Sequence, residues 1–532
     1  MVAILFGMKP EKAFIQALSD HIVNHYYPQV ISESISTPAS INNLKVSLLN
    51  PVRGILLDCA SGIGSTCITA GLHSKKHGGN LEIYAQEIMP VLCAVLRVRT
   101  FIHDIENCFV KAGDTLLNPL FKEGGHLKKF DHAVVHPIFG IAGDSLMNEV
   151  KNDRFNRFDV NYLGNSTEWL FALHLIVVLK EQGRGIAAVS TGALYNSTNR
   201  EIRRMLIQSG CIEPIITLPS KILTYTTIPL NLLVISKAKK RESSILMIQA
   251  ERLFEKNNSV RITEQLNDDV IKRITEICQG SLSLPGISES VPYEELTRGD
   301  CLLLPSRYVN PSNFESEFGP LLLDFQKTET WPQIRDVSRV IYRGLNITQN
   351  SSKIGGDEYK VINYSDVQNG ELIMDGVKSY RIRNPDKYLV KQDDVLVSCK
   401  GPTIKMCVVP ENVKNTCLSL NFVGIRLDKS KCSPRYLVHY LRSPVGQAYL
   451  INRQVGTSII TLKNSDFAEM PLYLPPLEEQ LTMISEYERF ERETNNEIKR
   501  LNDILRHSKW RLYTLMKLDS VILNKELISN ED

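Results

Sequence analysis

The chain has 532 residues, which at roughly 150 residues per domain suggests three or four domains. Hydrophobic residues make up 43% and charged residues 23% of the sequence, which excludes a disordered, collagen-like or coiled-coil-only protein. The 62 Lys and Arg residues nearly balance the 59 Asp and Glu residues, for a net charge of +3. Any surface that binds nucleic acid must therefore be local.

The eleven cysteines are odd in number, and none form a Cys-x-x-Cys pair, which is typical of free thiols in a reducing cytoplasm. The N-terminal apolar run is short and lacks a cleavage motif. No stretch approaches the roughly 20 apolar residues that a membrane helix needs. We therefore expect a soluble, cytoplasmic protein.

Strand and helix patterns alternate through the first 240 residues. Residues 1–35 predict a helical lead-in, Thr37-Pro38 opens a helix, and a long helical stretch covers 165–182. Buried strands are predicted at 53–58, 81–86, 130–136, 184–190, 213–218 and 230–237. This alternation predicts an α/β fold with a doubly wound, mostly parallel sheet.

A second regime begins near Trp331, after weaker helical fragments and a loop at 240–310. Short strands and Gly/Asn/Asp turns predict an α+β domain, and 331–480 holds 20 Lys/Arg against 15 Asp/Glu. Pro475-Pro476 then starts a long helix whose apolar stripe calls for a partner helix. That stripe comprises Ile484, Tyr487, Phe490, Thr494, Ile498, Leu501 and Leu505.

These patterns predict five segments. They are a helical lead-in at 1–35, a domain at 36–315, a second domain at 325–476, a dimerisation or partner helix at 477–518, and a tail at 519–532.

A glycine-containing loop follows the predicted strand at 53–58. Asp58 ends the strand, and Ala60, Gly62 and Gly64 lie in the loop that leads to a helix. Glycines let the backbone turn tightly and approach a ligand, and a helix start offers free N–H groups to an anionic group. Alone, such a loop is weak evidence for a ligand site.

Two acids at later strand ends strengthen this interpretation. Glu87 follows the second strand, where a carboxylate can accept both ribose hydroxyls, and Asp114 follows the third, where it can accept from an adenine amino group. Each acid taken singly is more simply explained as a solvated cap or turn residue. Together with the loop they predict a site for an adenosine ligand.

These motifs, in this order, resemble one family. DCASGIGS is similar to the Asp-Pro-Ala-Cys-Gly-Ser-Gly-Gly signature of the methylase subunit of type I restriction–modification systems, the gamma-class adenine-specific DNA methyltransferases. The similarity extends over about 35–310 and implies a Rossmann-like methyltransferase domain. It also implies that S-adenosylmethionine binds through Thr37, Asp58, Ala60, Gly62, Gly64, Glu87 and Asp114.

The family's catalytic motif, Asn-Pro-Pro-Phe, is altered here to His136, Pro137, Ile138 and Phe139. In the family the Asn oxygen and the first Pro carbonyl accept the two hydrogens of adenine's amino group, and the Phe stacks on the flipped base. A neutral His136 offers one acceptor in a different position, and loss of a preorganised acceptor costs roughly 3–4 kcal/mol. Ile138 also replaces a Pro that fixes the loop.

Two interpretations therefore stay open. One is a degenerate, inactive methyltransferase domain that binds S-adenosylmethionine without turnover, which the better-preserved cofactor loop favours. The other is an active adenine-specific DNA methyltransferase that tolerates His136. No Gly-Lys dipeptide is present, which excludes a Walker A motor, and no His/Cys cluster has the spacing of a zinc site.

Residues 331–480 resemble one target-recognition domain of a type I specificity subunit, most distinctively in VGTSIITLKNSDFAEMPLYLPPLEEQ. Such a domain holds phosphates and reads base edges with cations and amides. Candidate contacts to double-stranded DNA are Arg343, Lys353, Lys400, Lys405, Arg453, Thr457, Ser458 and Lys463. Each of these taken singly is more simply explained as a solvated surface residue.

The combined resemblance implies a sequence-specific DNA-binding protein of a restriction–modification or phage-defence system. A scaffold without DNA binding is disfavoured by the recognition domain. A type I specificity subunit normally has two recognition domains and two paired helices, whereas this chain has one of each. We expect a homodimer paired through the C-terminal helix. The alternatives are packing of that helix on the chain's own methylase domain and a partner specificity or restriction subunit.

Overall fold

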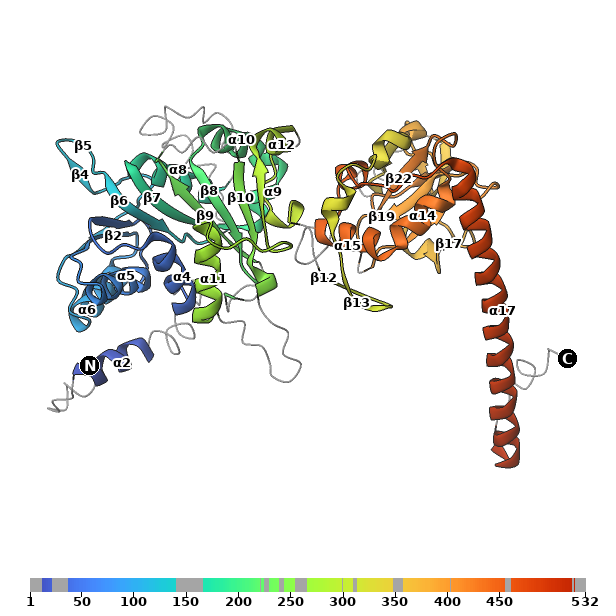
Figure 1. The fold of residues 1–532 in the computed structure, drawn as a ribbon, viewed down its shortest axis with the longest axis horizontal. Coiled ribbons are helices and arrows are strands. Elements are labelled where there is room, and N and C mark those ends of the chain that lie inside the picture. Colours follow the sequence, from blue (N-terminus) through green and yellow to red (C-terminus); the bar gives the residue numbers. More distant parts are fainter. Residues whose placement is uncertain are drawn as a thin grey trace. The chain divides into compact units, whose positions relative to one another are not determined.

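The computed structural model describes residues 12–21, 37–139, 166–220, 222–223, 229–238, 244–253, 266–298, 300–309, 313–347, 357–401, 403–454, 461–518 and 521. Contacts divide the chain into two units. Unit 1 ends at Leu323 and unit 2 begins at Asp324 (Figure 1).

Unit 1 is built around a nine-stranded sheet with the strand order β11-β10-β8-β9-β7-β6-β1-β2-β3 (Figure 1). Its strands are β1 (Ile55–Asp58), β2 (Glu82–Glu87), β3 (Cys108–Ala112), β6 (Phe130–Val135), β7 (Leu179–Ser190), β8 (Ile212–Thr217), β9 (Leu230–Ser236), β10 (Ser244–Gln249) and β11 (Ser288–Pro292). Its longer helices are α2 (Lys12–His21), α4 (Ala39–Leu49), α5 (Ser65–Lys76), α6 (Pro90–Ile102), α8 (Thr167–Val178), α10 (Arg200–Ser209) and α11 (Asp268–Cys278).

The strand directions confirm the expected α/β, doubly wound fold. Strand β1 pairs in parallel with β2 and β6, and β2–β3 and β6–β7 are also parallel. The sheet becomes mixed at β9, which is antiparallel to both β7 and β8. The chain winds from β1 toward β3 and then returns to β6 on the other side. The carboxyl ends of β1 and β6 therefore form the switch point at which open α/β sheets bind ligands.

The core cluster on one face of this sheet explains the helix patterns. Helices α4, α5 and α11 contribute apolar side chains that pack with those of the strands, including Ile41, Leu44, Ile68, Ile274, Leu56, Ile83 and Val134. Helix α8 packs on β6 and β7.

The expectation of a helix through residue 182 is wrong, because α8 ends at Val178 and β7 begins at Leu179. Leu179 pairs with Phe130 of β6, and the Nζ of Lys180 donates to both carboxylate oxygens of Asp131 at 2.9 Å. Pairing with β6 thus overrides the local helical pattern. Strand β10 was also missed, since it lies in the weakly patterned stretch 240–310.

Unit 2 is an α+β domain with a four-stranded sheet, β14-β22-β19-β20, and a three-stranded sheet, β18-β15-β21. The strands of these two sheets are β14 (Ser338–Arg343), β15 (Asp357–Ile362), β18 (Ser379–Ile382), β19 (Val395–Ser398), β20 (Met406–Val408), β21 (Thr416–Leu418) and β22 (Phe422–Leu427), and a short hairpin pairs β16 (Val367–Gln368) with β17 (Glu371–Leu372). Its helices include α14 (Pro434–Arg442), α15 (Pro444–Arg453), α16 (Asn464–Ala468) and α17 (Leu477–Leu515).

A buried ion pair joins the strands of unit 2. Asp394 is 0% exposed, and Arg426 donates to it through Nε at 2.8 Å and Nη2 at 2.7 Å. The hydroxyl of Tyr342 and the backbone N–H of Lys391 donate to the same carboxylate at 2.7 and 2.9 Å. The carboxylate is therefore fully compensated in the interior.

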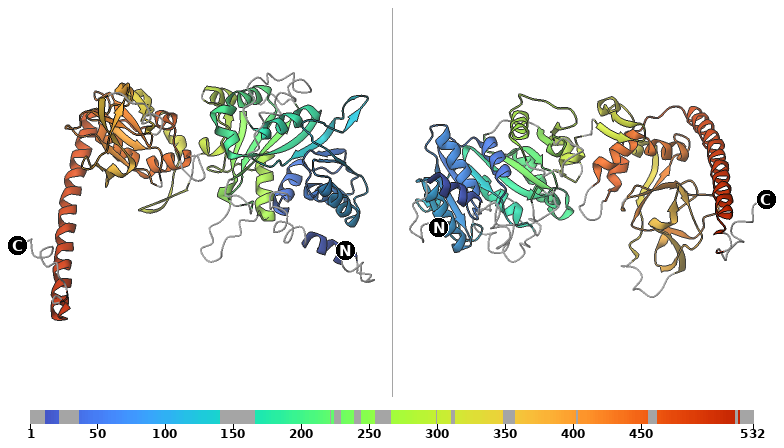
Figure 2. Two further views of the ribbon diagram at one scale, coloured as in Figure 1. Left: turned by 180° about the vertical axis from the view of Figure 1, so that it is seen from behind. Right: turned by 90° about the horizontal axis from the view of Figure 1, so that it is seen from below.

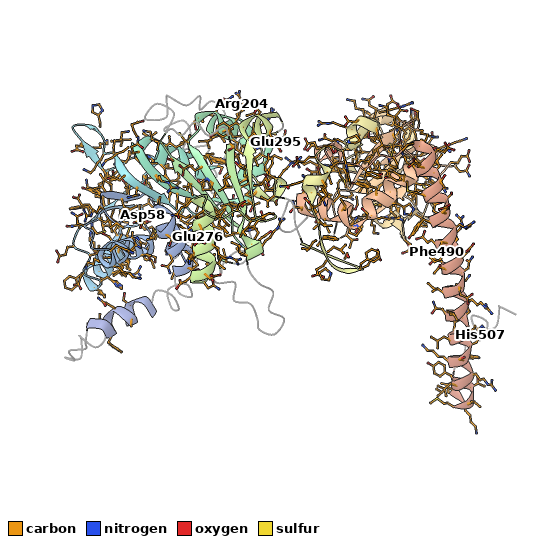
Figure 3. The ribbon with its side chains drawn as sticks, viewed as in Figure 1. Asp58, Arg204, Glu276, Glu295, Phe490 and His507 are labelled. Atoms are coloured by element: carbon orange, nitrogen blue, oxygen red, sulfur yellow. The ribbon has the colours of Figure 1, made fainter. Side chains whose placement is uncertain are left out.

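Helix α17 extends away from the rest of unit 2 over 39 residues (Figures 1 and 2). Only Gln480 and Ile484 are buried, both near its start. The Nε2 of Gln480 donates to the carbonyls of Lys431 at 3.0 Å and Pro475 at 2.8 Å, and this amide anchors the first turn of the helix. Tyr487 and Glu488 still contact His439 and Arg435 of α14, and farther along the helix side chains such as Phe490 and His507 project outward (Figure 3).

All eleven cysteines are free, as expected. None of the helices in the described ranges is long and apolar enough to span a bilayer.

Candidate cofactor site and candidate DNA interface

The loop between β1 and α5 is ordered by its own backbone bonds. The N–H of Gly64 donates to the carbonyl of Ser61 at 2.7 Å, and the N–H of Ser61 donates to that of Gln86 at 3.1 Å. Gly62 and Gly64 adopt φ angles of 52° and 79°, the left-handed region that favours glycine. A Cβ on Gly64 would lie 1.9 Å from the Cδ1 of Leu96 on α6. The fold itself therefore requires Gly64.

The two acids at the ends of β2 and β3 hold neighbouring backbone. Glu87 accepts from the N–H of Gly62 at 2.9 Å and of Met89 at 3.0 Å. Asp114 accepts through Oδ1 from the N–H groups of Leu116 and Leu117 at 2.7 and 3.1 Å. A carboxylate has about four acceptor positions, so both acids retain capacity for a ligand.

Asp58 ends β1 at the switch point and is only 3% exposed (Figure 3). It accepts from the N–H of Ala60 at 3.3 Å and from the thiol of Cys67 at 3.7 Å. Burial raises the pKa of Asp58 to about 6, against the opposing effect of the positive charge on Lys45. At pH 7 the carboxylate is therefore mostly ionised.

The sequence reasoning missed Lys45, the buried cation of this site. Its side chain is 1% exposed, and burial lowers its pKa to about 8, while the Asp58 carboxylate raises it. The Nζ of Lys45 lies 3.5 Å from the Nδ1 of His136. A signal was present, because Ile41, Lys45 and Leu48 fall on one helical stripe, but a lone lysine on such a stripe is normally solvated.

His136, directly after β6, is neutral. Burial lowers the pKa of His136 well below its usual range, and the charge of Lys45 lowers it further. Its Nδ1 also lies 3.2 Å from the Oγ1 of Thr37. Because the ammonium of Lys45 can only donate, we assign Nδ1 as the acceptor, which places the proton on Nε2. That nitrogen is buried without a hydrogen-bond partner among the described residues.

The rest of the altered motif splits between surface and core. Pro137 is buried, Ile138 is 53% exposed, and Phe139 packs partly against the core with its ring centroid 5.6 Å from that of His136. The structure thus brings the Thr37, Asp58 and His136 positions to one edge and adds Lys45.

Three of the proposed DNA contacts in unit 2 have partners within the protein. Arg343 donates to the carbonyl of Leu462 at 3.0 Å, and the guanidinium of Arg453 lies 3.4 Å from the ring centroid of Tyr449. The Nζ of Lys405 donates to the carbonyls of Tyr364 and Val367 at 3.0 and 2.9 Å. Lys400 and Lys463 are half-buried, and Lys353, Thr457 and Ser458 lie outside the described residues.

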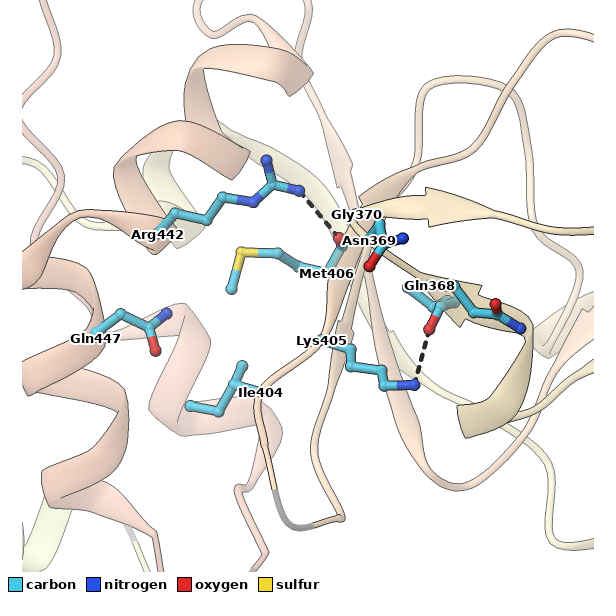
Figure 4. A pocket seen from close by; sticks show the side chains of 9 residues that line it. Gln368, Asn369, Gly370, Ile404, Lys405, Met406, Arg442 and Gln447 are labelled. Atoms are coloured by element: carbon cyan, nitrogen blue, oxygen red, sulfur yellow. Dashed lines mark hydrogen bonds between the residues drawn. The ribbon is translucent and has the colours of Figure 1, made fainter. Parts of the chain in front are cut away.

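A pocket of about 590 Å³ beside Lys405 supplies polar groups that the sequence did not single out (Figure 4). Arg442, at the end of α14, reaches it from one side, and Gln447 of α15 lies next to it. The turn at Asn369-Gly370 closes the other side. Two cations and several amides in an open pocket match the side-chain types that hold phosphates and base edges.

Two family models match these two units. Residues 22–317 match N-6 DNA Methylase, and residues 329–506 match the Type I restriction modification DNA specificity domain. The chain belongs to the N-6 DNA methylase family. A methylase domain and a specificity domain are fused in this family member, which confirms the resemblance drawn from the motifs.

Curated relatives cover the same two parts. The methylase subunit of type I restriction enzyme MjaVII from Methanocaldococcus jannaschii is 27% identical over 304 residues, or 54% of this chain and 52% of the relative. A putative MjaX specificity subunit from the same organism is 24% identical over 218 residues, or 39% of this chain and 50% of that subunit. The chain thus spans about half the length of these relatives.

Solved structures include a type I restriction–modification methyltransferase subunit from Streptococcus thermophilus. It is 22% identical, covers 52% of this chain and 59% of its own, and superposes with a TM-score of 0.46.

Proposed function

We propose that this chain is a sequence-specific DNA-binding component of a type I restriction–modification or phage-defence system, and that its methylase domain binds an adenosine cofactor with little or no methyl transfer. DNA recognition falls to the specificity domain in 329–506. The observation that carries the second part is the 3.5 Å approach of the Lys45 Nζ to the His136 Nδ1.

This approach removes the acceptor that adenine methylation needs. Amino-group methylation requires groups that accept the amino hydrogens and so free its lone pair. With Nδ1 turned to Lys45 and Thr37, His136 presents an N–H donor from Nε2 instead. Loss of one such preorganised acceptor costs roughly 100- to 1,000-fold in rate. Ile138, where the family has Pro, loosens the loop further.

The adenosine half of S-adenosylmethionine suits the residues present. The left-handed loop at Gly62, the acceptor capacity of Glu87 and Asp114, and the buried Ser61 hydroxyl, which has no hydrogen-bond partner among the described residues, all lie along the same strand ends. The methyl-bearing half of S-adenosylmethionine suits these residues less well, because its sulfonium is positively charged and the cation Lys45 lies beside His136 at the switch point.

Two measurements on the full chain test this proposal. A tritiated methyl-transfer assay on mixed genomic DNA should give at most about 1% of the rate of an active family member. Selection of bound duplexes from a random pool should enrich one sequence. Transfer at the rate of an active methylase would establish the competing function, an adenine-specific methyltransferase that retains Pro137 and Phe139. A pool without enrichment would overturn sequence-specific binding.

We also propose that α17 pairs two copies of this chain. Nine of its apolar side chains past Ile484 are at least 40% exposed, a cost that a partner helix would reduce at roughly 25 cal/mol per Å² of apolar surface buried. They are Tyr487, Phe490, Ile498, Leu501, Ile504, Leu505, Leu512, Tyr513 and Leu515.

The charges of α17 favour a second copy in antiparallel orientation. Residues 477–497 carry seven Glu and two Arg, whereas 498–515 carry one Asp and five Lys or Arg. Acidic residues near a helix start and basic residues near its end suit the macrodipole only within the terminal turns, so most of this separation needs another cause. Antiparallel pairing about a twofold axis places each acidic half against a basic half.

One register aligns the apolar residues as well. It places Ile498 beside Leu501 and Tyr487 beside Leu512 of the second copy, in heptad spacing. Such a dimer carries two equivalent recognition domains, so its DNA target is a split palindrome.

Charge reversal tests the pairing. A variant with Glu486→Lys, Glu493→Lys and Glu497→Lys, and another with Lys499→Glu, Arg506→Glu and Lys509→Glu, should each be monomeric by light scattering, and their equimolar mixture should form dimers. Ile498→Asp with Leu501→Asp should be monomeric in every mixture. A wild-type monomer at tens of micromolar, with and without DNA, would exclude the homodimer.

A further inference from the structure

A buried lysine lies at the ligand edge of unit 1, where the proposed function uses it chiefly to fix the proton position on His136. Lys45 enters this edge from α4, between the Asp58 carboxylate of β1 and His136 after β6. Its side chain is 1% exposed, so the ammonium is held among protein groups and not in solvent. Burying a charge is costly unless it is paired, so the ammonium depends on the negative charge of Asp58.

The carboxylates at the strand ends indicate that Lys45 takes the place of a positive charge on a ligand. Asp58, Glu87 and Asp114 end three adjacent strands, so without an internal cation this edge would attract a positively charged ligand. Glu87 and Asp114 are occupied in part by backbone N–H groups, whereas Asp58 accepts only from Ala60 and the weak thiol donor of Cys67 among the contacts described. Lys45 therefore supplies from inside the fold the counter-charge that Asp58 would otherwise take from a ligand.

We propose that Lys45 makes this site select adenosine ligands that carry no positive charge at sulfur, so that S-adenosylhomocysteine binds in preference to S-adenosylmethionine. The inference rests on the proposed adenosine site and names its ligand class. A sulfonium turned toward position 136 would lie near the Lys45 ammonium, whose Nζ is 3.5 Å from the His136 ring. Such a sulfonium and the Lys45 ammonium would repel each other, because the ammonium is only 1% exposed and solvent screens it little, and His136 is neutral and cannot offset them. A neutral thioether meets no such repulsion.

Calorimetry on the full-length protein with three probes tests this selection. S-adenosylhomocysteine should bind at least tenfold more tightly than S-adenosylmethionine. Sinefungin, which carries an ammonium in place of the methyl sulfonium, should bind as weakly as S-adenosylmethionine, which distinguishes charge from the bulk of the methyl group. Lys45→Met should reduce the ratio of the S-adenosylmethionine and S-adenosylhomocysteine dissociation constants at least fivefold, mainly through tighter binding of the methyl donor.

Controls keep the outcomes distinct. Lys76→Met removes an exposed lysine from α5 and should leave the ratio unchanged. Lys45→Gln serves as a second variant, and thermal unfolding confirms that each variant is folded. A folded Lys45 variant with the wild-type ratio would overturn the role of Lys45 and leave the adenosine site standing. A wild-type protein that binds none of the probes at millimolar concentration would overturn the adenosine site and this inference with it.

Discussion

The side-chain oxygen of Gln480 accepts a hydrogen bond from the backbone N–H of Ser433 at 2.9 Å. With its two donated bonds to the carbonyls of Lys431 and Pro475, this 0% exposed amide satisfies three backbone groups where α17 leaves the domain. The Leu-Pro-Pro-Leu-Glu-Glu-Gln stretch thus has a physical basis. Its prolines precede the helix directly, contrary to the expected strand before them, and its last residue fixes the start of the helix.

Gln480→Leu should lower the free energy of unfolding of unit 2 by about 2–4 kcal/mol, because it leaves buried backbone groups unsatisfied. Urea denaturation followed by the far-UV signal of the full chain measures this change. Glu479→Leu, at the exposed neighbouring position, is the matched control and should change it by less than about 0.5 kcal/mol. Equal effects of the two variants would contradict the anchoring role.

Gly64→Ala should destabilise unit 1 by about 2–4 kcal/mol, since a φ of 79° is unfavourable for alanine and its Cβ would meet Leu96. Gly78→Ala should cause only the backbone strain, because φ at Gly78 is 65° and nothing lies within 4 Å of the added Cβ. It should cost about 1–2 kcal/mol. Chemical denaturation of both variants separates packing from backbone strain, and adding Leu96→Ala to Gly64→Ala should relieve the overlap.

Asp394→Asn should destabilise unit 2 by about 3–5 kcal/mol, because it leaves the Arg426 guanidinium without its compensating charge. The exposed pair Lys327–Asp324 provides the contrast, and Lys327→Gln should change stability by less than about 0.5 kcal/mol. Native-state hydrogen exchange in β19 and β22 reports the loss. Unaltered exchange in Asp394→Asn would show that the pair contributes little.

Lys45 gives the stability of unit 1 a pH dependence of definite sign. Its pKa is about 8 in the fold and 10.5 in an unfolded chain, so the unfolded state binds more protons between these values. Stability therefore rises with pH across that window by up to about 3 kcal/mol from this group. Asp58 affects stability in a lower pH window, because its pKa is raised from 3.8 to about 6 in the fold. Between these two pH values the folded state binds more protons than the unfolded state, so the contribution of Asp58 to stability falls as the pH rises. Subtracting the Lys45→Met stability curve from that of the wild type should show the upper window, and Lys76→Met should not alter it.

Arg442→Gln should weaken DNA binding and reduce the slope of log affinity against log salt by about 1 if its guanidinium contacts a phosphate. Its melting temperature should stay close to that of the wild type, since the bond that Arg442 donates to the Met406 carbonyl is 3.5 Å long and therefore weak. Lys405→Gln should behave in the opposite way. It loses two bonds to the Tyr364 and Val367 carbonyls and the approach of its Nζ to within 4.2 Å of the Tyr364 ring centroid, so stability should fall first. An unaltered salt slope in Arg442→Gln would remove the pocket from the DNA interface.

The sheet and the position of its ligand edge were predictable, because alternating strands and helices leave few ways to connect a doubly wound fold. The loop at Gly62 and the acids Glu87 and Asp114 follow strand ends whose residue types mark them. The role of Gly64 was not predictable in the same way. Its absent side chain makes room for Leu96, a neighbour that only the three-dimensional packing reveals.

The place of Lys45 on an apolar helical stripe was too weak a signal to predict its burial, because that burial depends on Asp58 and His136, which are distant in sequence and meet it only in the folded protein. Similarly, Lys405 and Arg343 look like free cations in the sequence, yet the fold uses them to hold backbone carbonyls. The boundary between α8 and β7 was predicted wrongly for the same reason, because it depends on a contact between residues distant in sequence. Leu179 would continue a helix locally, and only its pairing with Phe130 makes it a strand.

The separation of charge along α17 also limits how many copies can assemble. Each helix carries an acidic stretch and a basic stretch in one continuous segment, so an antiparallel partner engages both at once. In the proposed antiparallel pair each acidic stretch lies beside a basic one, and the contact is closed by its own symmetry. A third copy would find no unopposed stretch of charge on the paired helices. We therefore expect assembly through this helix to stop at two copies.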